Sequence, residues 1–301
     1  DCFTAIAFGK SVESTSFYPK KHPFAEAFDS LMQEFAYRHI TPPWIWKALR
    51  RLPFEFGNEG AIKRHIRVID AFSNEVLDSR QSATSKLSDE GGDKYNDIIS
   101  LFHKHDPTLT REQLKHIAIN MIVAGRDTTR LLLSWCLYEL CMRPQIKQKV
   151  YAEIDAFVQQ NKSSEIDYDQ VGQSLFYTES TLLETLRLNP VVPWLIRTAQ
   201  RDVKLPNGNT VREGNEVIIP TYIVGRNPSV YPDPLTFDPN RFYGKDKDPV
   251  NVYDVYEYPF FNIKPRLCLG RKLALMESKV FLFYFCQRFE FEMVPNQEIK
   301  I

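Results

Sequence analysis

The sequence F-N-I-K-P-R-L-C-L-G occupies residues 261–270, and an apolar run with helical spacing follows it directly. Cys268 therefore stands where a loop becomes the N-terminus of a helix, which we expect to begin near Leu269. The free N–H groups and the positive dipole end of such a helix stabilise a thiolate. We interpret Cys268 as a candidate metal ligand; the alternative is a buried structural cysteine, because free cysteine is among the most buried residue types.

Two neighbours of this cysteine complete the pattern. Arg266 can aim a planar guanidinium at an anion beside a metal. Gly270 is expected to let the backbone pack closely. Alternatively, Arg266 and Arg271 are ordinary surface charges.

The composition predicts a globular protein. With 301 residues, 43% apolar and 13% aromatic, the chain can bury a large core in one or two domains. Lysine plus arginine equals aspartate plus glutamate at 38 each, so the charge gives no argument for a nucleic-acid partner. The 5 cysteines are odd in number and form no C-x-x-C pair, which argues against a disulfide framework or a zinc site. His103, His105 and Asp106 have no further ligand at metal spacing, so we do not interpret them as a metal cluster.

Hydrophobic periodicity predicts a mainly α (α+β) fold, a helical bulk with small β-sheets. Helices are expected over residues 24–39, 61–80, 110–142, 144–159 and 177–188, and short strands over 196–203 and 216–220 with a turn at 206–208. Thr110 and Gln113 have the spacing of a capping box at the start of the longest helix. The polar, glycine-containing stretch 82–93 is expected to be a surface loop.

Other motifs lie upstream of the cysteine. A-G-R-D-T-T at residues 124–129 interrupts the longest helix with Gly125, which costs about 1 kcal/mol relative to alanine. Its polar residues are either functional or solvated groups on the helix surface. Glu184 and Arg187 lie three apart on one helix, a weak signal alone because exposed pairs contribute only a few tenths of a kcal/mol. Two further segments are P-W-L-I-R at 193–197 and P-N-R-F at 239–242.

In this order, the motifs resemble those of the cytochrome P450 superfamily of haem-thiolate monooxygenases. The resemblance implies the family's fold, with haem b between the Cys268 loop and residues 124–129. It also implies O2 as co-substrate and NADPH as electron source through an NADPH-cytochrome reductase, a flavoprotein. Lys264 stands where the family usually has glycine, and a non-glycine residue in a strained backbone conformation costs about 1–3 kcal/mol. We therefore expect an altered loop shape there.

The resemblance also implies roles for individual residues. Cys268 is the expected iron ligand, and Asp127 and Thr128 are the expected catalytic pair that supplies protons. The expected cofactor-binding residues are Arg266, Arg197, Phe261, Gly270, Ala124 and Gly125. The expected structural network is Glu184, Arg187 and Arg241, and the expected substrate contacts are Val192, Trp194 and Leu195. Alternatives remain open: Arg197 as a strand-edge arginine, and Trp194 and Leu195 as plain core.

The chain is expected to be the C-terminal portion of a single longer domain. Trp46 and Arg50 imitate the W-x-x-x-R of the family's other propionate-binding helix but lie too near the central helix, so we interpret residues 42–53 as a proline-bounded connection. Residues 1–93 would then form lid-region helices and a loop, and residues 94–301 the haem-binding core. In the family a last β-hairpin would be forming where this chain ends, at Ile301.

The sequences of these motifs are most similar to those of the family's fatty-acid ω-hydroxylase branches. This similarity implies a substrate with a long apolar chain and a polar head. A terpenoid, sterol or xenobiotic hydroxylase is the alternative enzyme, and a non-catalytic haem-binding fragment the alternative of another class. Lys264, Arg271 and Lys272 could steer an acidic reductase, although ordinary solvated cations fit equally. Arg130 follows the two threonines at a position where the family usually has small or apolar residues, so the resemblance leads us to expect an unusual pocket there. For the full-length protein, the resemblance implies a location at the cytoplasmic face of the endoplasmic reticulum membrane, with an N-terminal helix as the anchor.

Overall fold

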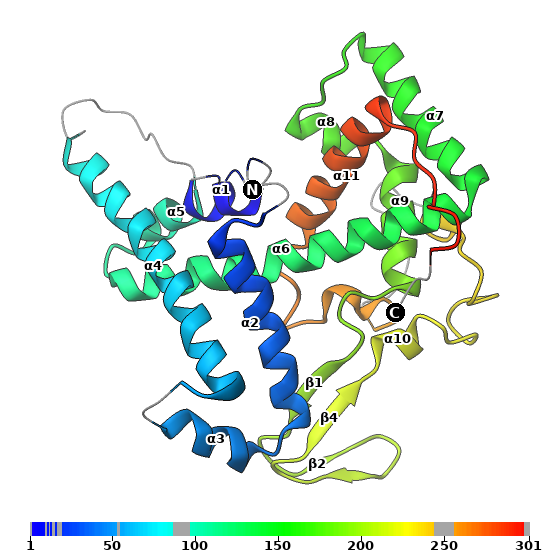
Figure 1. Ribbon diagram of the computed structural model, residues 1–301. Helices are drawn as coiled ribbons and strands as arrows, with labels where there is room; N and C mark the ends of the chain where they lie inside the picture. The colour runs from blue at the N-terminus through cyan, green and yellow to red at the C-terminus, as the bar shows by residue number, and fades with distance from the viewer. Residues whose placement is uncertain are drawn as a thin grey trace. The chain divides into compact units, whose positions relative to one another are not determined.

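The computed structural model describes residues 2–9, 11, 13, 16, 20–52, 55–86, 97–243 and 256–297 (Figure 1). The chain divides into two compact units, residues 1–126 and 127–301. The division falls inside the long helix α6 (Arg111–Met142), which contributes to both units. The expected boundary at residues 93 and 94 lies outside the described residues.

The first unit is helical. It contains α1 (Cys2–Phe8), α2 (Pro23–Ile40), α3 (Pro43–Arg51), α4 (Gly57–Lys86), α5 (Ile98–His105) and the start of α6. Phe24 and Phe28 of α2 pack with Ile62 and Ile69 of α4 in its core. The segment expected as a connection over 42–53 is the helix α3, which buries none of its residues. Because α4 extends to Lys86, the loop expected from residue 82 begins as helix instead, and its remainder lies outside the described residues.

The second unit combines helices with two small sheets. Its helices are the rest of α6, α7 (Pro144–Asn161), α8 (Tyr168–Gln173), α9 (Phe176–Leu188), α10 (Thr221–Val224) and α11 (Arg271–Arg288), with 3-10 turns η2 (Pro239–Arg241) and η4 (Pro259–Phe261). Strand β1 (Leu195–Thr198) pairs antiparallel with β4 (Glu216–Ile219), and β2 (Val203–Lys204) with β3 (Thr210–Val211). The predicted mainly helical fold with small sheets is confirmed.

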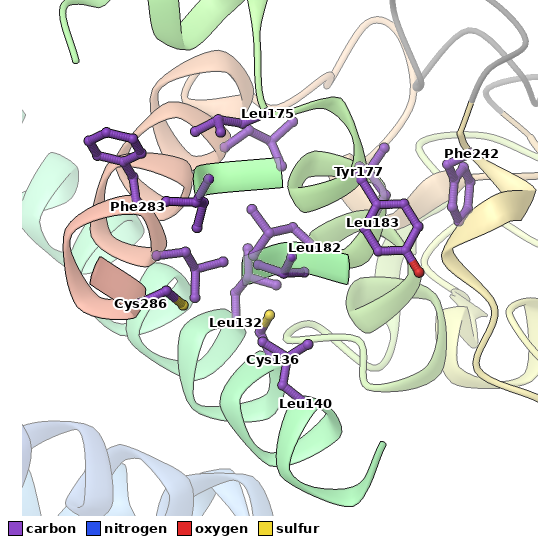
Figure 2. Packing of buried hydrophobic residues seen from close by; sticks show 14 of the residues in the cluster. Leu132, Cys136, Leu140, Leu175, Tyr177, Leu182, Leu183, Phe242, Phe283 and Cys286 are labelled. Atoms are coloured by element: carbon purple, nitrogen blue, oxygen red, sulfur yellow. The ribbon is translucent and has the colours of Figure 1, made fainter. Parts of the chain in front are cut away.

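Helix α9 forms the centre of this unit (Figure 2). Every residue from Tyr177 to Leu188 is buried except Glu179. Leu182 and Leu183 pack with apolar residues of α6 and α11, and each fully buried leucine contributes about 1.5–3 kcal/mol. The N-cap of α9 has no capping side chain, and Glu153 of α7 replaces it by accepting hydrogen bonds from the N–H groups of Tyr177 (2.7 Å) and Thr178 (2.8 Å). Helix α9 is thereby fixed at its start.

Helix α6 was predicted correctly at both ends. The capping box is present: Gln113 Oε1 accepts from the Thr110 N–H at 2.8 Å, and Thr110 Oγ1 accepts from the Gln113 N–H at 3.3 Å. The expected interruption at Gly125 is wrong, because residues 124–129 are helical throughout. Its hydrogen-bonded turns on both sides outweigh the propensity cost of one glycine. Among the described residues, no helix combines the length and apolarity that crossing a bilayer requires.

Candidate functional site

The loop before α11 presents Cys268 outward. The Cys268 N–H donates to the Phe261 carbonyl at 2.8 Å, and Phe261 packs against the core of its unit, so the loop is closed and anchored at its base. Helix α11 begins at Arg271 with Gly270 as N-cap, two residues later than expected. The side chain of Cys268 is exposed, which excludes the alternative of a buried structural cysteine.

Two other cysteines contrast with this one. Cys136 and Cys286 are buried in the core of the second unit. Burial raises the pKa of Cys136 to about 12 and that of Cys286 to about 11, because the apolar surroundings disfavour the charged thiolate. At neutral pH both remain neutral thiols, which do not act as metal ligands.

This contrast predicts the order of alkylation. In the haem-free native chain at pH 8, iodoacetamide is expected to modify Cys268 at least about 100-fold faster than Cys136 or Cys286, because only an accessible thiolate reacts. Peptide mass spectrometry over time would measure the three rates. In denaturant the rates should converge, and similar rates in the native chain would contradict the described burial.

The strained residue of the loop is Asn262, not Lys264. Asn262 has φ 66° and ψ −179°, a region of backbone conformation that is essentially restricted to glycine. Lys264 is not among the described residues with positive φ; it precedes Pro265 through a cis peptide bond. The expectation of strain at Lys264 is therefore wrong, because the turn is made two residues earlier.

Arg197 connects strand β1 to the same loop. Its Nη2 donates to Asn262 Oδ1 at 2.7 Å, and its Nη1 donates to the Ile196 carbonyl at 2.8 Å. Arg197 is thus bound to the Cys268 loop and is not merely a strand-edge arginine. Arg266 is exposed, and within the described residues its guanidinium forms no hydrogen bond or ion pair.

The residues of this loop fit a haem. A thiol suits the iron, and two guanidinium groups suit the carboxylates of the propionates. Apolar side chains are exposed on either side of the thiol, where Leu269 is 85% exposed and Leu267 39%. A Cβ added at Gly270 would meet no atom within 4 Å, so this glycine faces open space. The expected close packing by the chain itself at Gly270 is wrong.

Asp127 and Thr128, the expected catalytic pair, lie in α6. Ala124 and Gly125 belong to the first unit, while Asp127 and Thr128 belong to the second. The side chain of Asp127 is 22% exposed and lies 3.6 Å from Arg130, measured from Oδ1 to Nη2, so it is not a freely solvated surface group.

Sequence reasoning missed Thr129, the second threonine of the motif. It is buried, and its Oγ1 has no hydrogen-bond partner among the described residues. An unsatisfied buried hydroxyl costs about 1–3 kcal/mol, which is unusual enough to mark a functional region. In the sequence, the only indication that Thr129 belongs to a functional region was its position next to Thr128.

Glu184, Arg187 and Arg241 are joined as the sequence expects. Arg187 Nε and Nη2 donate to the Glu184 carboxylate at 2.6 and 2.7 Å, and Arg241 Nε donates to it at 3.3 Å. Both Glu184 and Arg187 are 0% exposed. Arg187 also donates to the carbonyls of Gly225 (2.5 Å), Pro234 (2.7 Å) and Thr236 (3.0 Å). This network ties α9 to the irregular segment that leads to the Cys268 loop.

The expected substrate contacts differ in exposure. Trp194 is 57% exposed, so the alternative that it is plain core is wrong, and Val192 is exposed as well. Leu195 is half-buried in β1. Each of them precedes Arg197 by at most five residues, which places them on the segment that is bound to the Cys268 loop.

The three candidate steering cations lie on and beside the loop. Lys264 and Lys272 are exposed. The Arg271 guanidinium lies 5.9 Å from the centre of the Phe261 ring. Arg271 and Lys272 also line a pocket of about 390 Å³ together with Tyr168, Glu179 and Lys279.

Comparison with known proteins gives consistent results. Cytochrome P450 monooxygenase cyp1 of Mycosarcoma maydis is 31% identical over 97% of this chain and 46% of its own length. Cytochrome P450 86B1 of Arabidopsis thaliana is 29% identical over 92% of this chain and 51% of its length. Cytochrome P450 4V2 of Homo sapiens is 29% identical over 89% and 52%. The chain thus spans about half the length of the curated relatives it matches.

A solved structure shows the same fold. The heme domain of cytochrome P450DA superposes with a TM-score of 0.80 at 23% identity, covering 100% of this chain and 61% of that chain. The family model described as Cytochrome P450 matches residues 1–301. With the exposed Cys268 loop, its bound arginine and this match along the whole sequence, the chain belongs to the cytochrome P450 family.

Proposed function

We propose that this chain is the haem-thiolate part of a monooxygenase, with Cys268 as the iron ligand. The observation that carries the proposal is the exposure of Cys268 on a closed loop to which Arg197 is bound. The two cysteines buried in the core of the same unit are kept as neutral thiols by their raised pKa, so they do not compete for the role. The match along the whole chain to the cytochrome P450 family supports the same reading.

The residues present would hold haem b as follows. Cys268 Sγ would bind the iron, the guanidinium groups of Arg197 and Arg266 would bind the propionates, and Phe261 would pack beside the ring. When bound, the haem supplies the activation of O2 and the insertion of one oxygen atom into a C–H bond, the other atom leaving as water. The Thr128 hydroxyl would orient a water molecule, and Asp127 would relay protons to that water.

The substrate in this proposal is a fatty acid, hydroxylated at or near its ω carbon. Exposed apolar side chains at Val192 and Trp194 would contact its chain. The electrons would come from NADPH through a flavoprotein reductase, with Lys264 and Lys272 as exposed cations beside the loop that an acidic partner would meet. The resemblance of the motifs to those of eukaryotic members favours the endoplasmic reticulum membrane as the location of the whole protein.

A ligand titration tests the substrate class. Dodecanoic acid added to the haem-loaded chain is expected to shift the Soret band to shorter wavelength, since a bound substrate chain would exclude water from the haem pocket. Dodecane lacks the polar head and is expected to bind at least about tenfold more weakly, a difference of 1.4 kcal/mol. A sterol or a monoterpene giving the only shift would overturn the fatty-acid assignment and favour the other hydroxylase class.

A further inference from the structure

Asn262 combines backbone strain with a specific side-chain role. Its φ of 66° with ψ of −179° is a conformation that non-glycine residues adopt at a cost of about 1–3 kcal/mol. Such a residue persists only where its surroundings hold it. Three hydrogen bonds do so here: its N–H donates to the Pro259 carbonyl at 2.8 Å, and its Oδ1 accepts from the Ile263 N–H at 2.9 Å and from Arg197 Nη2 at 2.7 Å.

The carboxamide fixes an arginine that is distant in sequence. Arg197 and Asn262 are 65 positions apart, one on β1 and the other at the base of the Cys268 loop. Arg197 has four rotatable bonds between its backbone and its guanidinium group, and a hydrogen bond to a rigid loop removes much of that freedom. The strained backbone of Asn262 sets the direction in which its Oδ1 points.

The chemistry of this acceptor is also specific. An amide oxygen orients a guanidinium group without neutralising its charge, whereas a carboxylate would neutralise it. Arg197 also donates to the Ile196 carbonyl, which is neutral too. Within the described part of the chain Arg197 forms no ion pair, so its charge remains available to an anion.

We propose that Asn262 is a positioning residue that orients the Arg197 guanidinium for a propionate of the haem while leaving its positive charge uncompensated. The inference rests on the proposed function, because the anion is a carboxylate of the cofactor. Asn262 thereby prepares the arginine before the cofactor arrives, which lowers the entropy cost of binding. Its strain is the consequence of placing an amide where the backbone favours glycine.

Four variants separate this role from a purely structural one. Asn262→Asp keeps the acceptor atom but adds a charge, and Asn262→Gly relieves the backbone strain but removes the acceptor. Arg197→Ala removes the arginine. Asn207→Ala is the matched control, because Asn207 Oδ1 also accepts a backbone hydrogen bond, from the Asn209 N–H at 3.1 Å, in an exposed turn.

The measurement is the rate at which haem leaves the loaded chain for an excess of apomyoglobin. Haem is expected to leave both Asn262→Asp and Asn262→Gly about tenfold faster than it leaves the wild type. Aspartate would neutralise the Arg197 guanidinium that binds the propionate, and glycine would remove the acceptor that orients it. In an Arg197→Ala background, Asn262→Gly should add no further acceleration. Urea denaturation of the haem-free chain supplies a second readout, in which Asn262→Asp keeps the wild-type midpoint because its hydrogen bonds remain.

Each outcome supports or overturns the proposal. A wild-type rate of haem loss in Asn262→Asp, or effects of Asn262→Gly and Arg197→Ala that multiply, would show that Asn262 acts only on the loop itself and overturn the inference. A change in Asn207→Ala equal to that in Asn262→Gly would do the same. Failure of the proposed function has a different signature, in which the wild-type chain retains no haem that depends on Cys268.

Discussion

Glutamine in place of Glu184 is expected to lower the free energy of unfolding by about 3–5 kcal/mol. The substitution preserves shape but leaves the Arg187 guanidinium, which is 0% exposed, without its counter-charge. The carbonyls of Gly225, Pro234 and Thr236 still accept from Arg187, yet neutral acceptors do not offset the desolvation of a buried cation. Arg241 would lose a partner as well. Urea denaturation followed by circular dichroism measures the difference.

An exposed ion pair provides the control for this prediction. Arg212 pairs with Asp202 at 2.8 Å, and their side chains are 73% and 49% exposed. Arg212→Ala is expected to change the free energy of unfolding by no more than about 0.5 kcal/mol, because exposed pairs contribute little. If Glu184→Gln proved as mild as Arg212→Ala, the network would not hold the segment before the Cys268 loop as we describe.

Replacement of Cys268 by serine is expected to abolish the proposed hydroxylation while the chain remains folded. The exposed side chain contributes little to the core, so the free energy of unfolding of the haem-free chain should change by less than about 0.5 kcal/mol. A serine hydroxyl stays neutral where a thiolate is required, so the ligand is lost outright. Product analysis with dodecanoic acid measures the activity. Cys141→Ser, a half-buried cysteine on α6, is the matched control and should retain full activity.

The sequence predicts those features whose causes are local. Helical periodicity with Pro144 at its start located α7, and the Thr110 capping box located the start of α6. Glu184 and Arg187 lie three apart on one helix, which is enough to predict their pairing but not their complete burial. The short helices α8 and α10 were missed, because their 6 and 4 residues contain too few turns for a period to be seen.

Non-local geometry accounts for the remaining errors. Nothing near Asn262 in the sequence reveals that its partner is Arg197, because the contact depends on how β1 packs against the loop. Strain was expected at Lys264 from the family pattern, whereas the backbone places it at Asn262. Helix propensity predicted an interruption at Gly125, but tertiary and hydrogen-bonding context keeps α6 helical. The exposure of Cys268 likewise becomes visible only in three dimensions.

The absorption spectrum of the reduced, carbon monoxide-bound chain, loaded with haem and compared with Cys268→Ala, tests the central claim most directly. We predict a strongly red-shifted Soret band in the wild type that disappears in the variant, because a thiolate donates more electron density to iron than a neutral ligand does. A band typical of imidazole ligation or free haem in the wild type, or a red-shifted band that survives in Cys268→Ala, would contradict the assignment of Cys268 as the iron ligand.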